Sequence, residues 1–259
     1  MKPLLRWLGL TAAALLALQL FFVARIAVMA VVTPESTAFE RSEAWRVLTE
    51  KGALPWRQQW VPYAQISNNL KRAVIASEDD GFAYHDGVDW DALEKAWQKN
   101  AKADALAQAQ AQAQAAKLAT KKPSANPAKA PPVVKAAKVV GGSTITQQLA
   151  KNLFLSGERT LLRKGQEFVL TMLLETLLNK ERILEIYLNN VEWGEGVFGA
   201  EAAAQHYFHK PASKLSTLEA ARLAVMLPRP KYFEKLPNSS YIAGRANVIA
   251  GRLVNAELP

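Results

Sequence analysis

The chain has 259 residues, half of them hydrophobic, which is enough for a folded core and excludes a largely disordered chain. It carries 32 Lys and Arg against 23 Asp and Glu, a formal net charge of +9. It contains no cysteine, which excludes disulfides and thiolate metal sites.

The positive charge is concentrated in two stretches. Residues 1–32 carry three cations and no acid, and residues 98–140 carry eight lysines against one aspartate. Subtracting their +3 and +7 from the total of +9 leaves −1 for the rest of the chain. The part expected to fold is therefore nearly neutral, which gives no support to nucleic-acid binding.

An uncharged apolar run from Leu8 to Ala24 continues beyond Arg25 to Val32. It predicts a helix of about 25 residues, long enough to cross a bilayer, with Arg25 near enough to the end to reach the interface. We therefore assign residues 1–33 to a cytoplasmic N-terminus and a transmembrane anchor. The basic residues before the run place the N-terminus in the cytoplasm and later residues on the other side of the membrane. A cleaved signal peptide, with a weak site at 27–30, is the alternative.

Residues 34–61 are interpreted as a membrane-proximal segment. Their three tryptophans suit the membrane interface and ordinary packing equally. Residues 62–259 are expected to form the main domain. Within it, residues 98–140 change to an Ala/Gln alternation and then a Lys/Ala/Pro tract, which predicts a flexible insertion whose first half is marginally helical. Its lysines suit anionic headgroups, and an inert insertion is the alternative.

A predicted helix over Ile66–Asp79 ends in three adjacent acids, Glu78, Asp79 and Asp80. The negative end of the helix dipole and the like charges both oppose ionisation, so at least one pKa should be raised. A carboxyl with a raised pKa suits general acid–base chemistry near neutral pH. A solvated acidic loop is the alternative.

Gly-Gly-Ser-Thr at residues 141–144 leads into Ile-Thr-Gln-Gln-Leu-Ala-Lys-Asn at residues 145–152. Thr144 and Gln147 have the spacing of a capping box, which predicts the start of a helix. Unpaired backbone N–H groups at that start, with Lys151 one turn beyond Gln147, suit an anion. An ordinary capped helix is the alternative.

A second group of charges precedes Phe168–Leu178, which is apolar nearly all round and is predicted to be a buried central helix. Glu167 lies four residues after Arg163 and three after Lys164, so the three share one helix face. Such charges at the mouth of a buried helix are costly unless they are used, and a structural salt bridge is the alternative.

The remaining pattern predicts a mostly α fold, because strand signals are nearly absent. His206 and His209 have no partner at metal spacing, so no zinc site is predicted. A glycine turn is expected over residues 193–199. Further helices are predicted over Lys180–Asn190, Ala200–Tyr207, Thr217–Leu227 and Ser240–Asn255.

Five blocks of residues occur in an order that resembles one protein family. They are Glu78-Asp79-x-x-Phe82-x-x-His85-x-Gly87, the stretch 141–152, Arg163-Lys164-x-x-Glu167, Lys180-x-x-Ile183-Leu184-Glu185-x-Tyr187-Leu188-Asn189 and Glu219-Ala220-Ala221-Arg222-Leu223-Ala224. Over about residues 62–235 the chain resembles the peptidoglycan glycosyltransferases, whose lysozyme-like domain polymerises lipid II. An N-terminal transmembrane helix also fits. Because the sequence contains no Ser-x-x-Lys, the resemblance is to the monofunctional biosynthetic transglycosylases, which lack transpeptidase activity.

The resemblance implies roles for individual residues. Glu78 is expected to deprotonate the C4 hydroxyl of the acceptor lipid II, and Glu167 to assist at the donor pyrophosphate. Lys151, Arg163 and Lys164 are expected to neutralise the leaving undecaprenyl pyrophosphate. The donor pocket is expected to be shaped by Ser143, Thr144, Gln147 and Gln148. The loop that carries Glu78 is expected to be supported by Asp79, Phe82, His85 and Asn152.

General chemistry agrees with these implied roles. Breaking a sugar–pyrophosphate bond puts negative charge on the leaving phosphate, which fixed cations stabilise. A carboxylate on the opposite face of the sugar activates the incoming hydroxyl, with inversion. No cofactor is expected to be required. Some family members respond to a divalent cation, Mg or Mn, at the pyrophosphate, and the sequence shows no dedicated metal site for one.

The resemblance also implies partners and alternatives. Lipid II, the growing β-1,4-linked glycan strand and the inner membrane are the expected partners, other cell-wall synthesis or division proteins are candidates, and no nucleic acid is expected. A lytic, lysozyme-like hydrolase would share the fold and Glu78, but its neutral glycan needs no cationic trio. A silent membrane-anchored scaffold would need neither Glu78 nor Glu167.

Overall fold

The computed structural model describes residues 2–119, 142–155, 157, 158 and 160–259. These residues form two compact units, residues 1–88 with 144–259, and residues 89–143. The second unit contains one long helix, α4 (Trp90–Ala119), which includes the part of the predicted insertion that was expected to be helical. The rest of that insertion, residues 120–140, lies outside the described residues.

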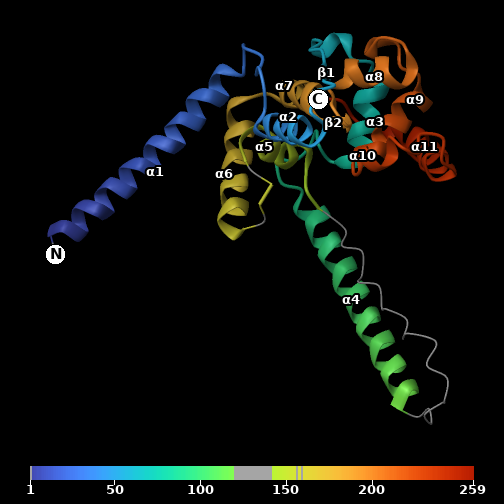
Figure 1. The fold of residues 1–259 in the computed structure, drawn as a ribbon, viewed down its shortest axis with the longest axis horizontal. Coiled ribbons are helices and arrows are strands. Elements are labelled where there is room, and N and C mark those ends of the chain that lie inside the picture. The colour runs from blue at the N-terminus through green and yellow to red at the C-terminus, as the bar shows by residue number, and fades with distance from the viewer. Residues whose placement is uncertain (1, 120–141, 156, 159) are drawn as a thin grey trace. The chain divides into compact units, whose positions relative to one another are not determined.

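The first unit is built almost entirely of helices (Figure 1). In chain order these are α1 (Lys2–Val28), α2 (Ala38–Lys51), α3 (Asn68–Glu78), α5 (Ile145–Phe154), α6 (Leu161–Leu177), α7 (Lys180–Asn190), α8 (Ala200–Phe208), α9 (Thr217–Met226), α10 (Pro230–Phe233) and α11 (Ser240–Arg252). Single 3-10 turns lie at Tyr63–Gln65, Ala212–Lys214 and Leu253–Asn255. The prediction of a mostly α fold is confirmed. Helix α3 begins later than predicted because the side chain of Ser67 accepts the Leu70 N–H and caps it there.

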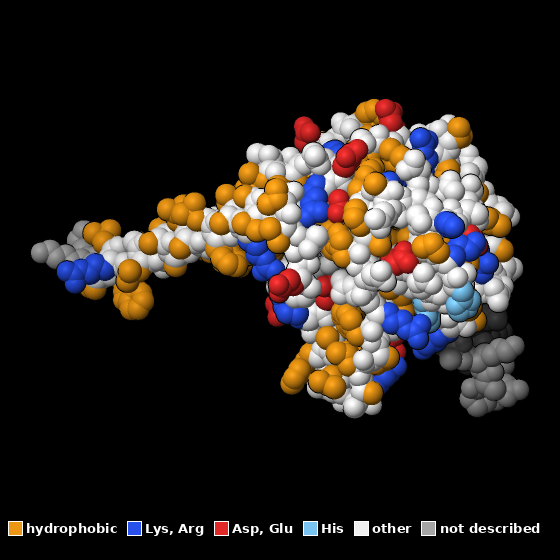
Figure 2. Space-filling model, turned by 90° about the horizontal axis from the view of Figure 1, so that it is seen from above, with side chains coloured by type: hydrophobic (Ala, Val, Ile, Leu, Met, Phe, Trp, Pro, Cys, Tyr) orange, Lys and Arg blue, Asp and Glu red, His pale blue; other side chains and the backbone are white. Residues whose placement is uncertain are grey.

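Helix α1 is, within the described part of the chain, the one helix long and apolar enough to cross a membrane, over Pro3–Met29. Its apolar side chains are exposed along most of its length (Figure 2). Its C-terminal half packs against other helices of the first unit. There the ring centroid of Phe22 and the Cζ of Arg25 each lie 5.4 Å from the ring centroid of Phe154. Such a helix is typical of a membrane anchor or a signal sequence.

A small sheet was missed by the sequence analysis. Strand β1 (Arg57–Gln58) runs parallel to β3 (Val197–Phe198), which pairs antiparallel with β2 (Glu192–Gly194). The predicted glycine turn joins β2 to β3. There Gly196 has a φ of +72°, and a Cβ on it would lie 2.0 Å from the Pro55 carbonyl oxygen. Strands of two or three residues are too short to show a period of two.

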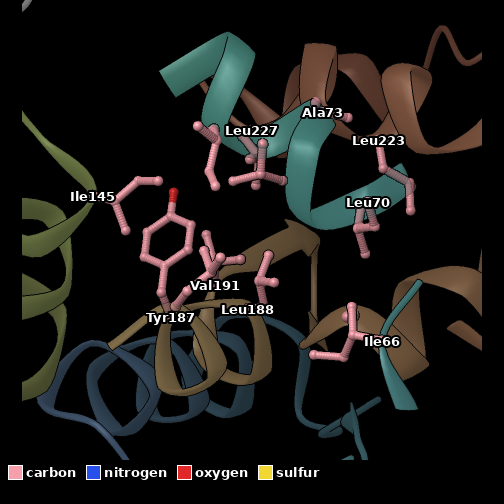
Figure 3. Close-up of a cluster of buried hydrophobic side chains, with 14 of the residues drawn as sticks. Ile66, Leu70, Ala73, Ile145, Tyr187, Leu188, Val191, Leu223 and Leu227 are labelled. Carbon is pink, nitrogen blue, oxygen red and sulfur yellow. The ribbon is translucent and has the colours of Figure 1, made fainter. Parts of the chain in front are cut away.

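The hydrophobic core lies where α3 packs against α9 and α11. Figure 3 shows part of it: Leu70 and Ala73 from α3, Leu223 from α9, and Tyr187 and Leu188 from α7 come together. These side chains are at most 1 % exposed. The core therefore fixes the position of α3, whose last residue is Glu78.

The prediction that Phe168–Leu178 is buried on all sides is wrong. Helix α6 packs against α5, α1 and α7, and these neighbours cover one face of it, including Leu170 and Leu174. Phe168 on the same helix is 43 % exposed, and Leu161 in its first turn is 92 % exposed. The sequence could not reveal this exposed face, because an apolar residue has the same identity whether or not other parts of the protein cover it.

The three tryptophans of residues 34–61 have different surroundings. Trp56 stacks on Phe198, with ring centroids 4.4 Å apart, and the Arg182 guanidinium lies 5.5 Å from the ring of Trp60. Trp45 on α2 is 70 % exposed. Trp56 and Trp60 are therefore packing residues, and Trp45 is the tryptophan of this segment whose exposure suits the membrane interface. The assignment of this segment as membrane-proximal stays a prediction.

Candidate active site

Glu78 ends α3 and is partly buried against α5. The Gln148 Nε2 donates a hydrogen bond of 3.0 Å to the Glu78 Oε2. Burial raises the pKa of Glu78, the like charge of Asp79 raises it further, and hydrogen bonds from Gln148 and Ser77 oppose the shift. The predicted raised pKa is confirmed, although burial rather than the neighbouring acid is its main cause. A carboxyl whose pKa is raised is suited to general acid–base chemistry.

Asp79, next to Glu78, is buried and joins three parts of the unit. Its Oδ2 accepts the backbone N–H of Ile145 at 2.9 Å, which caps the first turn of α5. Its Oδ1 lies 2.8 Å from the Nε2 of His85. Because the His85 Nδ1 accepts the N–H of Gly87, the ring proton lies on Nε2 and is donated to Asp79. Asp79 thus ties the end of α3 to both α5 and the following loop.

The loop over residues 79–87 is held on several sides. Phe82 is fully buried, and the Lys180 Nζ lies 4.6 Å from its ring centroid and donates to the carbonyl of His85 at 2.5 Å. The same Nζ lies 2.9 Å from the Glu175 Oε1 on α6. Gly87 has a φ of +87°, and an added Cβ would lie 2.7 to 2.9 Å from α6 side chains. The loop that follows Glu78 is therefore held in place by α5, α6 and α7.

The start of α5 has the capping box that the sequence predicted. The Thr144 Oγ1 accepts the Gln147 N–H at 3.2 Å, and the Gln147 Oε1 accepts the Thr144 N–H at 3.3 Å. Thr144 also donates to the Gly87 carbonyl at 2.7 Å. The expectation of unpaired N–H groups at this start is wrong for Ile145 and Gln147, because Asp79 and Thr144 accept them. Beyond the cap, Lys151 is exposed and Asn152 is partly buried.

Glu167 on α6 is 4 % exposed and is paired with two cations. The Arg163 Nη1 lies 2.8 Å from its Oε2, and the Lys164 Nζ donates to its Oε1. The Arg163 Nε is buried with no hydrogen-bond partner among the described residues. The three residues therefore share one helix face, as predicted, and carry a net charge of +1.

The predicted site residues lie on packed elements, with one exception. Glu78, Asp79, Phe82 and His85 lie at the end of α3 and in the loop after it. Thr144 caps α5, and the candidate residues from Gln147 to Asn152 lie on that helix. The charged trio lies on α6, which packs against α5. Ser143 is the last residue of the second unit and is exposed. The described residues contain no group of three or more acids, histidines or cysteines placed to hold a metal ion.

Comparison with known families adds an independent observation. The family model described as Transglycosylase matches residues 46–122 and 128–254. The chain belongs to the Transglycosylase family. The match covers every candidate site residue and is interrupted within the predicted insertion only at residues 123–127.

The transglycosylase has curated relatives of similar length. A protein of Burkholderia thailandensis is 52 % identical over 98 % of this chain and 88 % of its own length. One of Burkholderia pseudomallei is 50 % identical over the same shares, and one of Paraburkholderia xenovorans is 48 % identical over 98 % of this chain and 94 % of its own. Each of the three is named biosynthetic peptidoglycan transglycosylase.

Three polar residues of this transglycosylase were missed as parts of the site. Glu175 and Lys180 hold the loop of residues 79–87, and the Tyr187 hydroxyl donates to Gln148 at 3.0 Å. Glu175 had a signal in the sequence, because it interrupts an apolar helix. Lys180 and Tyr187 had none beyond their place in a family block, because their partners lie far away in the chain.

Proposed function

We propose that Glu78 is the general base with which this peptidoglycan glycosyltransferase polymerises lipid II into β-1,4-linked glycan strands in cell-wall synthesis. The observation that carries the proposal is a partly buried carboxyl of raised pKa that is held in place by Gln148 and by its rigid loop. The neighbouring helix α6 supplies the cations that the leaving group requires.

In the proposed reaction Glu78 accepts the proton of the C4 hydroxyl on the acceptor sugar. The hydroxyl oxygen attacks C1 of the donor sugar, and the bond from C1 to the pyrophosphate oxygen breaks. The electron pair leaves with undecaprenyl pyrophosphate, and the configuration at C1 inverts. Because the carboxyl keeps its proton more readily than an ordinary glutamate, it is a better base once ionised.

Arg163, Lys164 and Lys151 are proposed to neutralise the leaving pyrophosphate, with the polar residues at the start of α5 shaping that pocket. Both oxygens of Glu167 accept a hydrogen bond from a cation, one from Arg163 and one from Lys164. A carboxylate so engaged orients the two cations, so we assign Glu167 an electrostatic role rather than proton transfer.

The proposal includes neither a cofactor nor transpeptidase activity. The described residues do not fit a protein-held divalent cation, because no cluster of three ligands is present and Glu167 is occupied by its two cations. No step is therefore assigned to such an ion. A transpeptidase is left out because the sequence contains no Ser-x-x-Lys.

Incubation of the full-length protein in detergent with labelled lipid II tests the function directly. We expect a glycan polymer that lysozyme digests, together with release of undecaprenyl pyrophosphate. Cleavage of preformed glycan by the protein would instead support a lytic hydrolase. If neither reaction occurs under conditions in which a known transglycosylase is active, a catalytically silent scaffold is the better description.

The protein is further proposed to be anchored in the inner membrane by α1, with its N-terminus in the cytoplasm and the folded unit in the periplasm. The support is the exposed apolar surface of α1 and the basic residues Lys2 and Arg6 at its start. Protease added to spheroplasts is expected to degrade the folded unit, and an epitope at the N-terminus should be protected. A protected folded unit would contradict this orientation, and loss of the N-terminal epitope from the mature protein would indicate signal-peptide cleavage.

A further inference from the structure

A chain of two hydrogen bonds leads from the core to the candidate base. The Tyr187 hydroxyl on α7 donates to the Gln148 Oε1 at 3.0 Å, and the Gln148 Nε2 donates to the Glu78 Oε2 at 3.0 Å. Tyr187 is 1 % exposed, and Figure 3 shows its ring rising from α7 beside Ile145. The three residues come from α7, α5 and α3, so the arrangement exists only in the folded unit.

The direction of both hydrogen bonds is set by chemistry. An ionised carboxylate only accepts hydrogen bonds, so Gln148 must present its NH₂ group to Glu78 and its carbonyl oxygen to Tyr187. Burial, together with the negative charges of Glu78 and Asp79, raises the pKa of Tyr187 well above its usual value. Its hydroxyl therefore stays protonated and always has a hydrogen to donate.

Few other groups act on Glu78. Among the described residues these are the carboxylate of Asp79, the hydroxyl of Ser77 and the amide of Gln148. Asp79 is itself engaged with His85 and Ile145. Gln148 thus supplies one of two neutral hydrogen bonds that favour the ionised carboxyl against its burial.

We propose that Tyr187 is a positioning residue of the reaction, whose hydroxyl holds the Gln148 amide so that its N–H points at Glu78. The inference rests on the proposed role of Glu78 as the base. Without the hydroxyl, the carbonyl oxygen of the partly buried Gln148 side chain loses its partner, and the amide is free to turn. Glu78 then loses a directed hydrogen bond and binds its proton more tightly.

The test is the pH–rate profile of lipid II polymerisation by full-length Tyr187→Phe, which keeps the ring and removes only the hydroxyl. We expect the acidic limb to move upward by about half a pH unit to one unit. At pH values below the acidic limb, kcat of the variant should be about three- to tenfold lower than that of the wild type, while KM stays within about twofold. A profile that superimposes on that of the wild type, or a change confined to KM, would overturn the proposal.

Two further variants make the test specific. Tyr207→Phe is the matched control, because that partly buried hydroxyl donates to the Trp193 carbonyl at 2.8 Å and not to the site. It should leave the profile unmoved. Gln148→Met should reproduce the shift of Tyr187→Phe, and the double variant should add nothing to it, because both remove one pathway. If Tyr187→Phe does not fold, the pH–rate profile of Gln148→Met is the test. An acidic limb at the wild-type position in Gln148→Met would overturn the proposal.

The test separates this inference from the proposed function. If Glu78→Gln stays active, the base is wrongly assigned and the function proposal fails with it. If Glu78→Gln is inactive while Tyr187→Phe behaves like Tyr207→Phe, the base stands and the role of Tyr187 is refuted.

Discussion

Replacing Glu78 with glutamine is expected to lower the initial rate of lipid II polymerisation about a thousandfold, within the range that general-base catalysis contributes. Glutamine has nearly the same volume and its carbonyl oxygen can still accept the hydrogen bond from Gln148. It cannot accept a proton from the acceptor hydroxyl. The rate is best followed with labelled lipid II at saturating substrate, so that the loss appears in kcat.

Asp80→Asn is the matched control for Glu78→Gln. Asp80 lies two residues away, is exposed, and has its Oδ2 3.1 Å from an Arg252 nitrogen. An exposed ion pair contributes little, so this variant should keep the wild-type rate within about twofold. Equal losses in both variants, with unchanged thermal unfolding, would point to the overall charge of the loop rather than to Glu78 as a base.

The wild-type profile provides a second check on Glu78. Because burial raises its pKa, polymerisation should be lost on the acidic side at a pH above the usual pKa of a glutamate. Burial stabilises the protonated form of Glu78, and in that form Glu78 cannot act as a base. An acidic limb at or below the ordinary glutamate range would contradict the assignment.

The parts of the site that could be predicted are those decided within a few residues. The capping box of Thr144 and Gln147 and the pairing of Glu167 with Arg163 and Lys164 follow from spacings of three and four on a helix. These contacts depend on no other segment. The bounds of α7, Lys180–Asn190, were predicted from its amphipathic pattern, and in the structure the Asn179 side chain caps its start.

The parts that could not be predicted join distant segments. Asp79 reaches Ile145 across 66 positions, and Tyr187 reaches Gln148 across 39. A sequence shows that such groups are polar, but not which of them face one another. The expectation of an unpaired N–H group was wrong at Ile145 for this reason, because its acceptor, Asp79, comes from the end of another helix.

A second group of charged residues surrounds a buried carboxyl on β2. Glu192 on β2 is 7 % exposed, with its Oε1 3.4 Å from the Lys231 Nζ of α10. Lys231 also bonds to Glu43 on α2, and Arg46 lies 2.9 Å from that same carboxylate. Burial, helped by the negative charge of Glu43, raises the pKa of Glu192 to about 7 against the opposing effects of Lys231 and Arg46.

This pKa makes stability depend on pH in a defined direction. The usual value is 4.5, so between about 4.5 and 7 the folded protein binds more protons at Glu192 than the unfolded chain does. The free energy of unfolding contributed by this group therefore falls as the pH rises through that window and is constant above it. A difference of about 2.5 pKa units corresponds to about 3 kcal/mol for so buried a side chain.

Glu192→Gln is therefore expected to raise the free energy of unfolding by about 3 kcal/mol at pH 8 and to change it by less than about 1 kcal/mol at pH 5. The variant resembles the protonated form, so it avoids ionising a buried carboxyl. Lys231 keeps its bond to Glu43. Urea unfolding of the detergent-solubilised protein, followed by tryptophan fluorescence at both pH values, measures the difference.

Glu43→Gln should have the opposite sign. Burial alone would raise the pKa of Glu43, but hydrogen bonds and charges from Arg46 and Lys231 outweigh it and hold that pKa below its usual value. The ionised form is the stabilising one here, so the variant should lose stability at pH 8 and lose less as the pH falls towards the folded pKa. In this variant Lys231 no longer pairs with a carboxylate at position 43 and has only Glu192 as an acidic partner. This reduces the cost of ionising the buried Glu192, but only in part. If both variants destabilise equally at pH 8, Glu192 is stabilised by its cations rather than strained by burial.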